Sequence, residues 1–195
     1  MRIRTLAISI AVLALVLSAC GGSSKPTSEP KVTSPNGKPQ PTTAPGHIAK
    51  AAAADPSVSA KMVCQAEAVN DIAAVIGIKT TSISTPTWVD QVYACDYVYP
   101  GNGKMTLKVK ELSSVDETSA YYDQLAKDLG KKQDLQGLGE GAFSTKNGAV
   151  VTRKDYKVLI VDTSKLPAQY GVPPDTREND AINVSFTIME CWVGA

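Results

Sequence analysis

Acid–base chemistry in this chain would have to come from carboxylates, because histidine occurs only once. His47 stands in a proline-rich segment, so a Ser-His or Cys-His pair would require that segment to fold back onto the rest of the protein. No two acidic residues have a spacing that places their carboxylates on either side of a substrate. We therefore expect a protein that is not an enzyme, with a carboxylate-dependent enzyme as the alternative. The acidic residues considered are Asp90, Asp96, Glu111, Glu140, Asp155 and Asp162.

Two further features could contribute to a binding site. The segment 137–141, Gly-Leu-Gly-Glu-Gly, lacks the Lys-Ser/Thr of a phosphate-binding loop, so we interpret it as a turn into the following strand, and we expect no cofactor. Several aromatic residues could line an apolar pocket, although aromatic residues at these periodicities more often belong to a core. These residues are Trp88, Tyr93, Tyr97, Tyr99, Tyr121, Tyr122, Tyr156 and Trp192.

The N-terminus has the layout of a secretory signal. Arg2 and Arg4 precede an uncharged apolar run over 6–17, and small residues lead to Cys20. The run is shorter than the roughly 20 apolar residues that a membrane-spanning helix needs. Leu-Ser-Ala-Cys at 17–20 resembles the lipobox of bacterial lipoproteins. This resemblance implies that the signal peptide 1–19 is removed and that Cys20 receives a diacylglycerol thioether and an acyl chain such as palmitate, which holds the protein at the extracytoplasmic face of the cell membrane.

Three further cysteines lie in the part of the chain that would fold outside the cytoplasm, where disulfides persist. We prefer a bridge between Cys64 and Cys95, because Cys64 opens a helix-like segment and Cys95 lies in a strand soon after it. The loop of about 30 residues corresponds to about 3 kcal/mol of chain-entropy stabilisation. Cys191 would then remain a thiol, buried or available to a partner. A bridge between Cys95 and Cys191 is the alternative, and metal binding is disfavoured because no Cys-x-x-Cys spacing and no nearby histidine occur.

Charge and length limit the possible partners. The 195 residues include 20 basic and 19 acidic ones, and Arg2 and Arg4 belong to the signal, so the remaining chain is close to neutral. No basic field exists to attract nucleic acid by counterion release. The remaining length suits one domain. We therefore expect a monomer whose contact with the membrane is the lipid at Cys20.

The chain after the signal divides into a tether and a domain. Proline recurs over 20–56 among Ser, Thr, Lys and Gln, with almost nothing apolar to bury, which predicts a disordered tether that starts at the lipidated Cys20. The domain is predicted over 57–195. Apolar periodicity, a capping box at Ser114 and Glu117, and the hairpin signal Asn147-Gly148 define its elements. The predicted helices are 63–76, 115–129 and one that starts at Asp175, and the predicted strands are 91–99, 104–111, 141–145, 148–153 and 156–163.

This order predicts an α+β domain in which helices cover one face of an antiparallel sheet of about five to six strands. The strand 156–163 is almost continuously aliphatic and is predicted to be central. In the final helix, Ile182, Phe186 and Met189 share a predicted buried face with Val193.

Four features together resemble the secreted lipoproteins of unknown function that are common in actinobacteria. They are a cysteine that opens an amphipathic helix ending in Ile-Gly (64–77), a Cys-x-Tyr strand (95–97), a Leu-Gly-Glu-Gly-Ala turn (138–142), and a proline-rich leader behind a lipobox. The resemblance implies a surface lipoprotein with a Cys64–Cys95 bridge and no established catalytic residue. Cys191-Trp192 near the end departs from this pattern.

We therefore expect a lipid-anchored cell-envelope domain that binds and does not catalyse. Its partner would be a small apolar or envelope-derived molecule between helices and sheet, or an envelope protein on the exposed face of the sheet. A cavity of about 300 Å³ or more lined by aromatic residues would favour the small ligand, and a contiguous exposed apolar patch without a cavity would favour a protein. Two carboxyl groups with opposed pKa shifts in one cleft would favour the enzyme.

Overall fold

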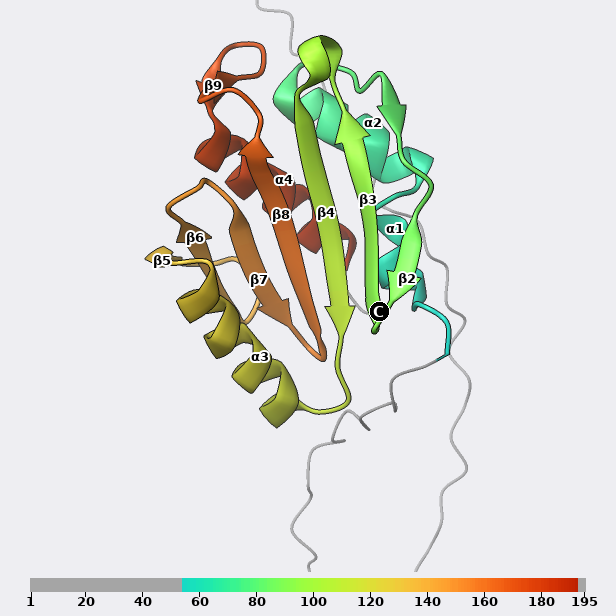
Figure 1. Cartoon of the computed structure of the whole chain (residues 1–195), viewed down its shortest axis with the longest axis vertical. Coiled ribbons are helices and arrows are strands. Elements are labelled where there is room, and N and C mark those ends of the chain that lie inside the picture. Colours follow the sequence, from blue (N-terminus) through green and yellow to red (C-terminus); the bar gives the residue numbers. More distant parts are fainter. Residues whose placement is uncertain (1–53, 193–195) are drawn as a thin grey trace, which may run out of the picture. The chain divides into compact units, whose positions relative to one another are not determined.

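The computed structural model describes residues 54–192 (Figure 1). The predicted signal peptide 1–19, the lipidation site Cys20, and His47 with most of the predicted tether lie outside the described residues. The folded chain begins at α1 (Val58–Met62), where the Ser57 side chain accepts a hydrogen bond from the backbone N–H of Ala60.

The domain has the predicted α+β class, and its sheet is larger than predicted, with eight strands. Every strand pairs antiparallel with its neighbours, in the order β1-β3-β4-β8-β7-β6-β5, with β2 also paired to β3. The strands are β1 (Ser82–Ile83), β2 (Thr87–Val89), β3 (Val92–Val98), β4 (Lys104–Glu111), β5 (Lys131–Leu135), β6 (Gly141–Thr145), β7 (Val150–Lys154) and β8 (Lys157–Lys165). A separate pair is formed by β9 (Gln169–Tyr170) and β10 (Asp175–Thr176).

Strict alternation along β4 gives the sheet two different faces. Met105, Leu107 and Val109 are fully buried, whereas Thr106 and Lys108 are half-buried on the opposite face. The predicted central strand is confirmed, because β8 lies between β4 and β7.

The first face of the sheet carries the main core, which is covered by α1, α2 (Ala66–Ile76) and α4 (Arg177–Cys191). In Figure 1, α2 and α4 pass behind β3, β4 and β8. The predicted helix 63–76 is present as the shorter α2, because the chain turns between Met62 and Gln65 around Cys64, and α1 before this turn was not predicted.

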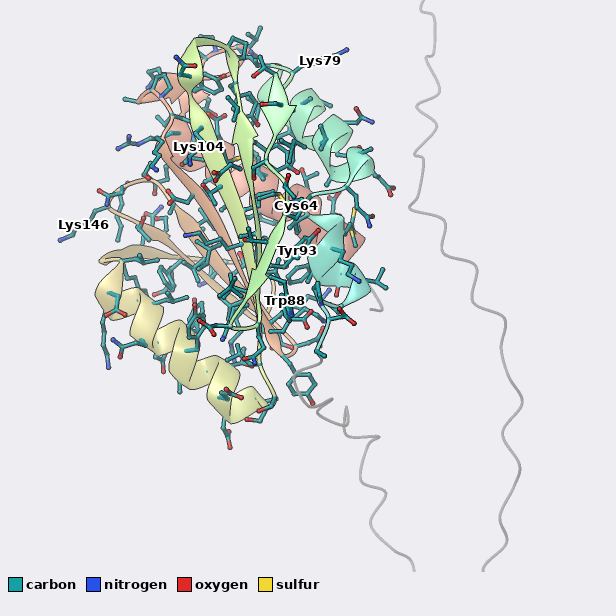
Figure 2. The ribbon with its side chains drawn as sticks, turned by 45° about the vertical axis from the view of Figure 1, so that its right-hand side comes forward. Cys64, Lys79, Trp88, Tyr93, Lys104 and Lys146 are labelled. Atoms are coloured by element: carbon teal, nitrogen blue, oxygen red, sulfur yellow. A yellow bond between two sulfur atoms is a disulfide. The ribbon has the colours of Figure 1, made fainter. Side chains whose placement is uncertain are left out.

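The Cys64–Cys95 disulfide joins this turn to β3, with a Cα–Cα distance of 6.1 Å (Figure 2). The preferred bridge is therefore present, and the alternative bridge from Cys95 to Cys191 and the metal interpretation of these cysteines are both wrong. Cys191 lies in the last turn of α4, half-buried and outside the bridge.

The remaining helix, α3 (Val115–Asp128), differs from the expected arrangement because it packs on the second face of the sheet. There it closes a smaller apolar cluster with Phe143, Val151 and Val158, which also face that side. The Ser114 hydroxyl accepts from the N–H of Glu117, as the capping box predicts. Helices pack on both faces of the sheet because β7 and β8 carry apolar side chains on both of their faces.

The final helix begins two residues later than predicted, and most of its buried residues lie outside the predicted face. Its N-cap is Thr176, whose hydroxyl accepts from the N–H of Asn179, while Asp175 belongs to β10. Phe186 on the predicted face is 39% exposed. The buried residues of α4 are Asp180, Ala181, Val184, Ser185, Ile188 and Met189, of which Met189 belongs to the predicted face, and Val193 lies outside the described residues.

Candidate functional site

A groove of about 460 Å³ lies on the second face of the sheet, beside α3. Helix α3 contacts β7 and β8, and no helix crosses in front of β3 and β4 in Figure 1. The groove therefore forms where the helix stops covering the sheet. It has a floor of strand residues, one helical wall, and a polar end.

The floor comes from three neighbouring strands. Lys108 of β4 lies between Ala94 of β3 and Ile160 of β8 in the pairing register, so its ammonium group rises from between two apolar neighbours. Val92 and Lys110, which face each other across β3 and β4, extend the floor toward the start of α3. This register, and not sequence proximity, brings the floor residues together.

The wall is one stripe of α3. Tyr121, Leu125 and Leu129 follow each other at a spacing of four residues, so they share one side of the helix and face the groove. Leu129 is exposed and marks the open rim. A ligand that entered the groove would cover this apolar stripe.

The far end of the groove is polar. Asp162, Thr145, Asn147 and Ser164 line it together with Ala149. The Asp162 carboxylate accepts from the backbone N–H of Ser164 at 2.9 Å. The Thr145 hydroxyl is buried and has no hydrogen-bond partner among the described residues.

The two lysines of the groove are held differently. Lys110 Nζ donates to the backbone carbonyl of Asp90 at 2.6 Å and lies 5.9 Å from the centre of the Tyr121 ring. Lys108 is half-buried and forms no hydrogen bond or ion pair with any described residue. A half-buried cation without a counter-charge is a natural attachment point for an anion.

Lys104, further along β4 on the same face, is by contrast already paired. Its Nζ lies 2.8 Å from Asp96 Oδ2, and the Thr106 hydroxyl donates to the other carboxylate oxygen at 2.7 Å (Figure 2). Burial alone would raise the pKa of Asp96, but the hydrogen bonds from Lys104 and Thr106 outweigh it and hold that pKa below its ordinary value. The positive charge of Lys104 is therefore balanced before any ligand arrives.

The predicted aromatic residues do not gather at one site. Tyr121 alone among them lines the groove. Tyr97, Tyr99 and Trp192 are buried in the main core, and Tyr122 packs edge-on against Phe143 beneath α3. The others lie elsewhere: Tyr93 is half-buried against the main core, the Trp88 indole donates to the carbonyl of Ala54, and Tyr156 stands in the turn between β7 and β8.

The acidic residues considered from the sequence are also dispersed. Asp162 is the one that lines the groove, and Glu111 accepts from the N–H of Ser57 on the other face of the sheet. Asp90 and Asp155 have φ of +50° and +53° in tight turns. Glu140 lies in the glycine-rich turn, where its N–H donates to the carbonyl of Arg153. In the described part of the chain no group of three or more metal-ligating side chains converges, and no helix there is long and apolar enough to cross a membrane.

Comparison with protein-family models, with curated proteins and with solved structures finds no match. The likeness to actinobacterial lipoproteins therefore stays a prediction. The chemistry of the groove has to be argued from its own residues: an apolar wall and partly apolar floor, one unpaired cation, and no second carboxylate among the residues that line it.

Proposed function

We propose that this protein is a lipid-anchored cell-envelope lipoprotein whose domain binds a small, largely apolar molecule in the groove beside α3. The observation that carries the proposal is the groove itself. Its volume of about 460 Å³ falls within the range of small-molecule sites and exceeds the expected volume of about 300 Å³, while the expected aromatic lining is reduced to Tyr121. Leu125, Leu129 and Ile160 supply the apolar surface that such a molecule would cover.

The other expected functions have less support. The large apolar side chains that are exposed, such as Val58, Val75 and Val172, are spread over α1, α2 and the loop before β10, so they favour no protein interface. An enzyme using two carboxylates would need a partner for Asp162 in the groove, and the lining residues offer none. Non-catalytic binding is therefore the proposal.

Anchoring at Cys20 would place the groove outside the cell at the membrane surface. The lipobox resemblance supports this location, and the proline-rich segment after Cys20 would give the domain reach. A domain in this position would meet lipids and other envelope molecules before any cytoplasmic compound.

The test is to fill the groove and measure binding of Nile red, a neutral apolar dye whose fluorescence rises in apolar sites. The protein would be the chain from residue 20 with Cys20→Ser, which carries no lipid. Ala94→Trp puts an indole on the floor and should weaken dye binding at least tenfold. The matched control is Thr87→Trp, because Thr87 faces Ala94 on the neighbouring strand, is exposed and does not line the groove.

Unchanged dye affinity in the Ala94→Trp protein, with a normal melting transition, would refute the groove as the binding site. Equal weakening by both tryptophans would refute it as well, because Thr87 lies outside the groove.

A further inference from the structure

The charges of the groove narrow the class of ligand. We propose that the groove takes a single-chain carboxylic acid of the fatty-acid type, with the ammonium group of Lys108 as the counter-ion of its carboxylate. This inference rests on the proposed function, and it adds that the ligand carries one negative charge at one end of an unbranched hydrocarbon chain.

The first argument is that Lys108 is the lysine of the groove whose ammonium group has no hydrogen-bond or ion-pair partner among the described residues. The Lys110 ammonium has a carbonyl oxygen and an aromatic ring as partners. The Lys104 ammonium has the Asp96 carboxylate. Lys108 has neither, and its strand neighbours Ala94 and Ile160 offer only apolar surface. An anion bound there would gain a charge-assisted hydrogen bond in a partly desolvated place.

The second argument is the shape of the groove. From Ile160, which faces Lys108, to Ser164, β8 extends over four residues, or about 13 Å at the usual rise. An extended chain of ten carbons is about 12 Å long, since each carbon–carbon bond of about 1.5 Å adds about 1.3 Å. Such a chain fits along the floor beneath Leu125 and Leu129, starting from Lys108.

The third argument is the position of the groove's own negative charge. Asp162 lies at the polar end, one face position beyond Ile160 on β8, and Ile160 faces Lys108. Its carboxylate would repel an acid head group at that end. The head group is therefore directed to Lys108, and the hydrocarbon chain extends from there along Leu125 and Leu129 on the wall of the groove.

The experiment compares decanoate with decan-1-ol by calorimetric titration at pH 7.5, on the same lipid-free chain. The two molecules share a hydrocarbon chain and differ in charge. Decanoate should bind at least tenfold more tightly than decanol. Lys108→Met keeps the aliphatic stem and removes the charge, so it should reduce decanoate affinity to that of decanol and leave decanol affinity unchanged. Lys108→Arg should retain most of the preference.

The matched control is Lys104→Met, which removes an equal charge from the same strand and face outside the groove. It should leave the preference for decanoate intact, whereas a loss equal to that of Lys108→Met would show only a general effect of net charge and would overturn the assignment. Equal affinity for decanoate and decanol would also overturn it, while binding of Nile red that is sensitive to Ala94→Trp would still support the groove. Absence of Nile red binding would instead reject the proposed function.

Discussion

Asp180 is a buried acidic residue that should make the stability of the main core depend on pH. Its side chain is 4% exposed in the first turns of α4, and its Oδ2 has no hydrogen-bond partner among the described residues. The hydroxyl groups of Tyr99 and Tyr170, whose rings stack edge to face nearby, are unpartnered in the same sense. Burial raises the pKa of Asp180 to about 6, and the negative charge of Asp175 adds to this rise.

The raised pKa means that the folded protein holds this proton more tightly than the unfolded chain, in which the pKa of Asp is about 3.9. The stabilisation is present below about pH 4 and is lost as the pH rises through 6. Asp180→Asn imitates the neutral acid, so it should match the parent near pH 4 and be more stable by about 3 kcal/mol at pH 7.5. Urea unfolding at both values measures this, and an Asn variant that is less stable at pH 7.5 would contradict the assignment.

At the scale of elements, the glycine-rich segment 137–141 acts as the turn that its composition predicts. Gly139 has a φ of +59°, and a Cβ placed on it would come within 2.5 Å of the carbonyl oxygen of Arg153. Gly137 has a φ of +75° but no neighbouring atom within 4 Å of such a Cβ. The two glycines therefore share the left-handed backbone and differ in the space around them.

This pair separates backbone strain from steric overlap. Gly137→Ala should cost about 1 kcal/mol, the usual penalty for a left-handed alanine. Gly139→Ala should cost at least about 2 kcal/mol more, because β7 must also move away. Denaturant unfolding of the two variants compares them directly, and equal free energies of unfolding would show that the close contact with Arg153 is easily relieved.

The elements that the sequence predicts well are those in which local pattern and tertiary burial agree. The bounds of β4 and β6 match the predicted strands, because alternation and turn residues mark both ends. Strand β5 was missed, since Lys131–Leu135 is charged and mostly exposed and is held at the edge of the sheet by backbone pairing with β6. Strands β1 and β2 are too short to show any period.

The candidate site was less predictable than the fold, and the reason is register. Tyr121 and Asp162 are among the residues considered from the sequence, but nothing there places them in one groove. Lys108 lies on the half-buried face of β4, and no local pattern indicates that Ile160 lies beside it. The pairing of Lys108 with Ile160 depends on the register in which the β3–β4 hairpin joins the β7–β8 hairpin through β4 and β8. No short-range sequence pattern specifies that register.

At the scale of the whole molecule, the disulfide fixes the segment that connects the N-terminal chain to the domain. Cys64 lies between α1 and α2, and its partner Cys95 lies in β3, 31 residues later. The Tyr97 hydroxyl donates to the carbonyl of Val63 at 2.6 Å beside it. Force applied to the chain before α1 would therefore load α1 first and would then pass at Cys64 through the disulfide to β3.

The proposed membrane attachment concerns the whole chain and has its own test. Cys20→Ser should leave uncleaved precursor or release the protein from the membrane fraction, because the serine hydroxyl cannot form the thioether. Cys191→Ser is the matched control, since it removes another cysteine outside the disulfide and should leave the protein with the membranes. Mature-size Cys20→Ser protein that still sediments with membranes would contradict the lipobox prediction.

Helices α3 and α4 bury different numbers of side chains, and this difference affects how easily each helix separates from the sheet. Thr118 is the one residue of α3 that is fully buried, whereas α4 buries six. A helix held by so few buried side chains separates from its sheet at a lower free energy than global unfolding requires. The backbone amides of α3 should therefore exchange with solvent deuterium sooner than those of α4. Because α3 is also the wall of the groove, each such opening would widen the site and let a ligand enter from the side.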